Sequence, residues 1–466
     1  MFEFSFFNYI KHNKNLYNYL ISISNIFPQR LIHGKKYYEI ISLLRKNEKK
    51  ENEDIIKKLM RKRLAIVLSE SLAFVPYYKE TIKINPTDIN EGNAEDILRS
   101  FPFLDKRTVI DNHKDFINIK FSKSKLIFSS SSGSTGAIKL CYSRSEYVDI
   151  EKAFFDYEWG KIGYEPKCRI VRIAADINKQ TDKKPCEKIG NRLLISPFHL
   201  NSICMEKIYN KIIAFNPDFF HSYPSCLQEI AKFIIQNDKP VIRCKGLFLA
   251  SEAFTPYQYE LFRKAFSTSI IASYGLSERS VLAFTELDEK KQDKIYYKLN
   301  NIYGYTENLI DEFGNPEIIG TSYWNTVMPL IRYRTQDFGE IENGVIKRLD
   351  GRAQEYLITK SNHKISGLII DIENILDWRF VESCQVIQNE IGKLVIRIVP
   401  KPDFNDGVKN IILEQLENKW NHLFDFSIEI VNKISRANSG KFRMYINNIL
   451  NLSQLFFVFE FISSMM

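Results

Sequence analysis

The chain has 466 residues, 44% of them hydrophobic and 26% charged, and a formal net charge of +9. This length exceeds what one hydrophobic core usually serves, and the composition is unlike that of disordered chains, so we expect a folded protein of more than one domain. Basic and acidic residues are interleaved, as in residues 49–54. That pattern indicates a solvated surface and argues against a nucleic-acid partner.

The seven cysteines are scattered and never form a C-x-x-C pair, which favours a reducing cytoplasm over a zinc site or a disulfide framework. The first residues lack a basic run and are interrupted by Lys11 and Lys14, so we expect neither a signal peptide nor a membrane span. A basic cluster at 57–63 predicts no more than weak attraction to an acidic membrane. The apolar run at 455–462 is too short to span; we interpret it as packing on a small domain, with a membrane-touching tail as the alternative.

Helical periodicity marks the N-terminal part of the chain. Apolar residues recur at helical spacing in 40–44 and 55–59, on either side of a charged linker. Val75 and Pro76 end this pattern, because proline cannot continue a helix. We therefore predict a helical region at residues 1–80 that forms part of the large domain.

From about residue 125, strand-like runs alternate with amphipathic segments, which predicts an α/β domain of mixed sheets and helices over 81–352. A β-rich stretch follows at about 295–350. Beyond Gly351 and Arg352 the order of elements suits a small, mobile α+β domain at 353–466. The strands expected in the two domains are 126–128, 170–173, 246–249, 269–272, 384–388, 394–399 and 427–431, and a helix is expected at 410–420.

A Ser- and Gly-rich stretch between two strand-like runs carries the first chemical signal. It reads SSSSGSTGAIK at 129–139. Glycines let a backbone approach an anion, hydroxyl and N–H groups donate to its oxygens, and Lys139 adds a positive charge, so the stretch is a candidate cradle for a polyphosphate. It is not a Walker loop, because its glycines are too close together. The alternative is a flexible connector.

Five motifs in order give the chain a resemblance to the adenylate-forming superfamily, in the branch of phenylacetate-CoA ligase and the CapK-type capsular polysaccharide proteins. The resemblance runs from Val75 onward. It implies the family's fold, a large domain followed by a small lid domain, and it implies binding of ATP and magnesium. The first motif is the loop just described, which by resemblance holds the β and γ phosphates of ATP through Ser132, Gly133, Ser134, Thr135, Gly136 and Lys139.

The second and third motifs are ASE at 250–252 and SYGLSE at 273–278. By resemblance, Ser251 and Glu252 line the adenine pocket, and Ser273 and Gly275 belong to the nucleotide site. Tyr274 is expected to stack on adenine, Ser277 to contact the α-phosphate and Glu278 to help hold magnesium. A carboxylate suits that ion, which prefers one or two carboxylates together with phosphate oxygens. Taken alone, such a turn would be structural.

The fourth motif is MPLIRYRTQD at 328–337. Asp337 is expected to accept hydrogen bonds from both ribose hydroxyls, which suits a group with two acceptor oxygens. Gln336 replaces the usual glycine, so we expect a different local turn. For Arg332 and Arg334, direct ligand contact and structural ion pairs both stay open.

The fifth motif pairs Gly351-Arg352 with NSGKFR at 438–443. By resemblance, Arg352 contacts ribose or phosphate, and Lys441 bridges the substrate carboxylate and the α-phosphate. A fixed cation is most useful where negative charge builds on phosphorus. Gln354 departs from the family's usual Asp or Lys at the hinge, which puts domain rotation in question more than adenylation itself.

The acyl pocket is expected near 196–200 and 221–224, with His199 and Tyr223 as candidates for facing the substrate. A satisfied structural histidine is the alternative. The resemblance implies an AMP-forming acid ligase that passes its acyl group to coenzyme A or to an amine. Two other functions stay open: transfer of AMP to a cofactor, and a catalytically silent nucleotide-binding role in a polysaccharide assembly.

Overall fold

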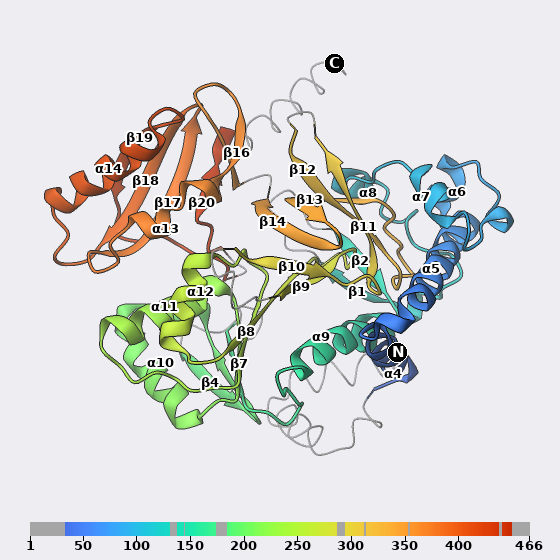
Figure 1. Ribbon diagram of the computed structural model, residues 1–466, viewed down its shortest axis with the longest axis horizontal. Coiled ribbons are helices and arrows are strands. Elements are labelled where there is room, and N and C mark those ends of the chain that lie inside the picture. The colour runs from blue at the N-terminus through green and yellow to red at the C-terminus, as the bar shows by residue number, and fades with distance from the viewer. Residues whose placement is uncertain are drawn as a thin grey trace.

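The computed structural model describes residues 33–130, 138–143, 145–173, 184–286, 294–311, 314–352, 355–437 and 440–449. They form a large α/β domain and a smaller C-terminal domain that lies beside it (Figure 1). The fold class expected from the sequence is confirmed. Expectations for residues 1–32 and for the apolar run at 455–462 fall outside the described residues. Within the described ranges, no helix combines the length and the apolar character needed to cross a bilayer.

The N-terminal part is helical, as its periodicity predicts. The second helix ends at Phe74, and Pro76 begins the next one, because proline is tolerated at the first helical position, where no N–H partner is needed. Ile40, Ile56, Leu64 and Leu68 turn into the core from these helices. The helices are α4 (Lys35–Asn47), α5 (Glu53–Phe74), α6 (Pro76–Thr81), α7 (Ala94–Arg99) and α8 (Lys106–Asp111).

Twelve of the described strands form one mixed sheet in the order β11-β12-β13-β14-β10-β9-β8-β7-β6-β3-β5-β4. The parallel part holds β5, β3, β6, β7 and β8, and the strands from β9 to β11 are paired antiparallel. The parallel strands are β3 (Ile170–Ile173), β5 (Arg192–Ile195), β6 (Phe219–Ser222), β7 (Gly246–Ala250) and β8 (Ser269–Gly275). The others are β4 (Cys186–Ile189), β9 (Leu282–Glu286), β10 (Tyr296–Leu299), β11 (Gly304–Ile310), β12 (Pro316–Ser322), β13 (Tyr333–Glu342) and β14 (Val345–Arg352).

Two helices beside the parallel strands begin at side-chain caps. Asn201 caps α10 (Ser202–Phe215) by accepting from the Cys204 amide, and that helix ends at Asn216 in the left-handed conformation. Thr255 and Gln258 form a reciprocal capping box at the start of α12 (Pro256–Ala265). Between them runs α11 (Pro224–Gln236), whose apolar side packs into the same core as β6 and β7. The cap of α12 also contacts the C-terminal domain, because the Thr255 hydroxyl donates to Glu373 Oε2 at 3.1 Å.

A second core lies between the N-terminal helices and the remaining elements of the large domain. It includes the two-stranded sheet of β1 (Ile127–Ser130) and β2 (Lys139–Tyr142), together with α9 (Glu151–Gly160). The aromatic residues Phe101, Phe116, Tyr142 and Phe154 are almost fully buried there.

The C-terminal domain has a separate core, drawn from residues between Leu357 and Tyr445. Its four-stranded sheet has the order β19-β18-β17-β20, and the helix and the strands predicted between 384 and 431 are confirmed. The predicted boundaries at 80/81 and 352/353 stay predictions. The elements are β15 (Tyr356–Ile358), β16 (Lys364–Ser366), α13 (Ile372–Ile375), β17 (Val381–Glu390), β18 (Lys393–Pro400), α14 (Asp406–Trp420), β19 (Asp425–Ile430) and β20 (Tyr445–Asn447).

Candidate active site

A cavity of about 1500 Å3 lies between the large domain and the C-terminal domain. Its walls come from the carboxyl ends of β7 and β8, from β13 and β14, and from the segment that carries Lys441. The carboxyl end of parallel strands is where α/β sheets usually bind ligands. The predicted site residues that line the cavity are Ser251, Glu252, Ser273, Tyr274, Gly275, Ser277, Glu278, Asp337, Arg352 and Lys441.

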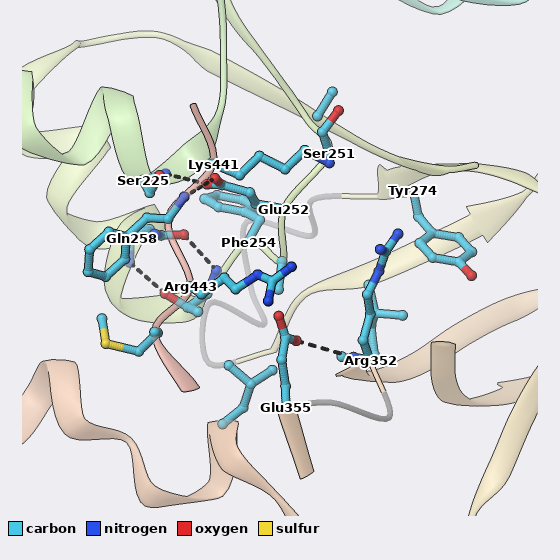
Figure 2. Close-up of a pocket in the computed structure, with 18 of the residues that line it drawn as sticks. Ser225, Ser251, Glu252, Phe254, Gln258, Tyr274, Arg352, Glu355, Lys441 and Arg443 are labelled. Atoms are coloured by element: carbon cyan, nitrogen blue, oxygen red, sulfur yellow. Dashed lines mark hydrogen bonds between the residues drawn. The ribbon is translucent and has the colours of Figure 1, made fainter. Parts of the chain in front are cut away.

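Asp337 is the centre of a buried polar cluster at one end of the cavity. The Tyr274 hydroxyl donates to its Oδ2 at 3.0 Å, and the Arg352 Nε lies 3.2 Å from its Oδ1. Burial raises the pKa of Asp337 above its ordinary value, while Arg352 and Tyr274 act in the opposite direction. Figure 2 shows Tyr274 and Arg352 together on this side of the pocket. The carboxylate is therefore held in place before any ligand arrives.

Glu278 follows β8 and is a second buried carboxylate, only 8% exposed. The Tyr333 hydroxyl donates to its Oε1 at 3.2 Å. Burial raises the pKa of Glu278, and the charges of Lys106 and Arg352 oppose that shift. One buried carboxylate on a cavity wall fits Mg²⁺, since this ion shares its coordination with phosphate oxygens and water. Over the described ranges, no group of three or more His, Cys, Asp or Glu residues is arranged to hold a metal by itself.

The wall beside Ser277 combines aromatic surface with an ion pair. The Tyr142 hydroxyl donates to the Ser277 carbonyl at 2.7 Å. Arg279 lies over the rings of Tyr142 and Tyr147, 4.7 and 4.9 Å from their centroids, and its Nε is 3.6 Å from Glu151. All five residues line the cavity. This part of the site offers both apolar and charged contacts.

Lys441 reaches the cavity from the C-terminal domain, and its Nζ lies 6.0 Å from the centre of the Tyr223 ring. Burial and the nearby Arg352 lower the pKa of Lys441, whereas Glu252 and Asp337 raise it. Glu252 accepts a hydrogen bond from the amide of Phe442, the residue after Lys441. The lysine predicted to be catalytic and the carboxylates of the large domain therefore lie in one cleft.

Arg332 and Arg334 are structural, which resolves the alternative that the sequence left open. Arg332 makes a two-point ion pair with Glu307, with Nε–Oε1 and Nη2–Oε2 distances of 2.8 and 3.0 Å. Arg334 donates twice to Oε2 of Glu317, a carboxylate that is 1% exposed. Neither arginine is among the residues that line the cavity.

Gln336 lies beside Asp337 with a φ of 60°, in the left-handed region that glycine adopts at little cost. Its amide donates to Glu317 Oε1 at 2.9 Å. The turn thus has a conformation suited to glycine although a glutamine occupies it.

Several predicted residues lie outside the described part of the chain or away from the cavity. The former are Ser132, Gly133, Ser134, Thr135, Gly136 and the hinge residue Gln354, whose roles stay predictions. Lys139 is exposed on β2, with its Nζ 4.7 Å from the centre of the Phe128 ring, and it does not line the cavity.

The two acyl-pocket candidates lie next to the cavity. His199 and Tyr223 are not among its lining residues, whereas Phe198, Leu200 and Ser225 are. His199 ends a short helical turn, and among the residues that the structure describes its buried Nδ1 has no hydrogen-bond partner. Their predicted contact with substrate stays a prediction.

Sequence reasoning missed many residues of the cavity wall, among them Lys106, Ser225, Glu355 and Arg436. Glu355 accepts from the Arg352 amide at 3.1 Å, and burial raises its pKa. Its place directly after the expected hinge residue Gln354 was the one available signal. The other three come from distant segments that only the tertiary fold brings together.

Comparisons with known proteins agree with this geometry. A family model described as the CapK C-terminal domain matches residues 357–448. Protein CapK of Staphylococcus aureus is 26% identical over 95% of this chain and 99% of its own length. Phenylacetate-coenzyme A ligase of Escherichia coli K12 is 24% identical over 66% of this chain and 73% of its own.

Among solved structures, 2-hydroxyisobutyryl-CoA ligase in its postadenylation state matches with a TM-score of 0.63. The match covers 86% of this chain and 92% of that one at 14% identity. Fold and cavity together define a two-domain α/β protein whose site is closed by its C-terminal domain. The chain is thus similar to protein CapK over nearly its whole length, its C-terminal part matches the CapK C-terminal domain, and it shares the fold of an adenylate-forming CoA ligase.

Proposed function

We propose that the protein is an AMP-forming acid ligase. A carboxylate oxygen of the acid attacks the α-phosphorus of ATP, the bond to pyrophosphate breaks, and an acyl-adenylate forms. The observation that supports this most is one cavity lined by Lys441, Glu278 and Asp337, a lysine and two carboxylates drawn from both domains. No covalent enzyme intermediate is needed, because positioning and charge neutralisation supply the catalysis.

In this mechanism Asp337, which is held in place by Tyr274 and Arg352, accepts hydrogen bonds from the two ribose hydroxyls of ATP. Lys441 lies between the acid carboxylate and the α-phosphate and stabilises the negative charge that builds on phosphorus. Ser277 contacts the same phosphate. Glu278 is the residue that would hold magnesium, and the ion would supply positive charge next to the phosphates.

The remaining motif residues bind the rest of the nucleotide. Tyr274 presents its ring to adenine while its hydroxyl stays on Asp337. Ser251, Ser273 and Gly275 complete that pocket from the ends of β7 and β8. The loop with Ser132, Gly133, Ser134, Thr135 and Gly136 takes the β and γ phosphates, and Lys139, which follows this loop and does not line the cavity, adds positive charge nearby.

The acyl group then passes to coenzyme A or to an amine acceptor. The similarity to phenylacetate-coenzyme A ligase supports coenzyme A as the acceptor. A place in surface polysaccharide synthesis follows only from the motif resemblance to CapK-type capsular polysaccharide proteins. The acid itself lies against the wall of Tyr142, Tyr147, Glu151 and Arg279, which is both aromatic and charged.

Pyrophosphate release over a panel of carboxylic acids tests the proposal. Because the cavity wall contains both aromatic and charged residues, the panel should include aryl, aliphatic and hydroxy acids of similar size. We expect at least one acid to support release with MgATP, and Lys441→Ala to reduce that release by about 100-fold or more, as loss of a transition-state cation does.

Two results would contradict it: no acid supports release by the wild type, or Lys441→Ala leaves acid-dependent release unchanged. Product analysis then separates acyl transfer from AMP transfer, since only the former yields a thioester or an amide.

A further inference from the structure

Glu252 joins the two domains next to Lys441. Its Oε2 accepts from the Ser225 amide at 3.0 Å, and its Oε1 accepts from the Phe442 amide at 3.0 Å. Ser225 lies in the first turn of α11 in the large domain, and Phe442 belongs to the C-terminal domain. One carboxylate therefore links both sides of the cleft, and Figure 2 shows Ser225, Glu252 and Lys441 gathered at one end of the pocket.

A second contact from the same segment strengthens this link. Arg436 donates to the Ser225 hydroxyl at 2.9 Å and to the Ser225 carbonyl at 3.3 Å. It also donates to the Gly440 carbonyl at 3.3 Å, and the Ala437 amide donates to the Lys441 carbonyl at 3.0 Å. Hydrogen bonds thus connect the residues next to Arg436 with those next to Lys441, and Arg436 attaches them to the start of α11.

We infer that Glu252 is a positioning residue for Lys441, holding the lysine segment in the cleft instead of contacting adenine. This inference rests on the proposed function and departs from the role expected for Glu252 from family resemblance. Both of its oxygens are occupied by protein amides, one from each domain. The start of a helix is a favourable place for a carboxylate, because its first N–H groups lack partners within the helix.

The substitution Glu252→Gln keeps the shape of the side chain and removes the bridge. An amide has one acceptor oxygen, so its NH2 group must face either the Ser225 or the Phe442 N–H. One of the two hydrogen bonds that join the domains is then lost, and the segment next to Lys441 is no longer fixed to the large domain by residue 252. Since small displacements of a reacting group cost about 100-fold in rate, we expect kcat for acid-dependent pyrophosphate release to fall by roughly 10- to 100-fold. KM for ATP should change by less than about threefold, because the nucleotide contacts are kept.

A double-mutant cycle shows whether Glu252 acts through Lys441. We expect Glu252→Gln combined with Lys441→Ala to be no slower than Lys441→Ala alone. Multiplicative losses would overturn the inference, as would a rise in KM for ATP with kcat unchanged, which is the behaviour of an adenine contact. The matched control is Glu260→Gln, which removes a carboxylate from the exposed side of α12 and should leave kcat within about twofold.

Amide hydrogen exchange gives a readout that needs no turnover. In the full chain without substrate, Glu252→Gln should speed exchange of the peptide that contains Phe442, and Arg436→Gln should do so to a smaller extent. Unchanged exchange in Glu252→Gln would overturn the docking role. A wild type that releases no pyrophosphate with any acid would contradict the proposed function and the catalytic half of this inference, while faster exchange would still support the docking half.

Discussion

In the proposed mechanism, Lys441 has to keep its positive charge in surroundings that partly disfavour it. Burial is the largest influence that lowers the pKa of Lys441, and the guanidinium of Arg352 on β14 acts in the same direction. Asp337 on β13, Glu252 after β7 and Glu355 at the start of the C-terminal domain oppose that shift. The charged state therefore depends on carboxylates from several elements.

We predict an alkaline limit to adenylation that follows from this lowered pKa. In the proposed mechanism the protonated lysine is the active form, so kcat/KM for acid-dependent pyrophosphate release should fall as pH rises through a pKa below the usual value of about 10.4. Lys441→Arg should be slower at every pH but should lack the decline, because guanidinium stays charged. The measurement is kcat/KM against pH for both proteins.

An equal alkaline decline in wild type and Lys441→Arg would assign the titration to another group. Thermal unfolding over the same pH range is the control, because it separates loss of the active form from loss of the fold.

At the scale of elements, the strand β13 carries an unfavourable residue at a decisive turn. Gln336, with a φ of 60°, lies between Thr335 and Asp337, and a non-glycine residue in the left-handed region costs about 1–2 kcal/mol. We predict that Gln336→Gly raises the free energy of unfolding by roughly 0.5–1 kcal/mol, because glycine's extra freedom in the unfolded chain offsets part of the gain. Urea denaturation measures this change.

Gln336→Val is the comparison at the same position. A β-branched residue is least compatible with positive φ, so Val should lower the free energy of unfolding by about 1 kcal/mol or more. If Gly were less stable than the wild-type glutamine, the Gln336 side chain would be contributing more than its backbone costs.

The same strand illustrates what sequence alone could and could not predict. Asp337 and Glu278 stand in contiguous motifs, and short-range patterns were enough to place them on one cavity. Arg334 stands in such a motif too, but its partner Glu317 comes from the neighbouring strand, and strand pairing is a tertiary property. The link from Glu252 to Phe442 spans both domains and leaves no local trace.

The spacing of apolar residues was enough to predict individual helices and strands. The helix α5 and the strand β3 bury one face or both, so their apolar spacing reports their structure directly. The contacts between domains are mostly polar, and polar surface residues carry no such periodicity.

At the scale of the whole molecule, α11 is the surface on which the C-terminal domain rests. Its first turn holds the segment of Arg436, and farther along Lys232 lies with its Nζ 3.1 Å from the centre of the Trp378 ring. Gln236 at the end of α11 donates to the Trp378 carbonyl at 3.0 Å. The C-terminal domain is therefore attached to α11 at two places: at the first turn through Arg436, and farther along through Trp378.

Removal of the Trp378 ring should loosen the C-terminal domain. Lys232 is 7% exposed, and a desolvated cation over an indole contributes about 2 kcal/mol. In Trp378→Ala that charge stays buried beside Glu229 without its aromatic partner. We predict a larger radius of gyration for Trp378→Ala in small-angle X-ray scattering and a reduced rate of adenylation, because Lys441 is then less often in the cleft.

Arg379→Ala is the matched control, since this neighbour is exposed and pairs with Asp377 of its own domain. A Trp378→Ala protein with the scattering profile of the wild type would show that the Glu252 link holds the domain without this contact.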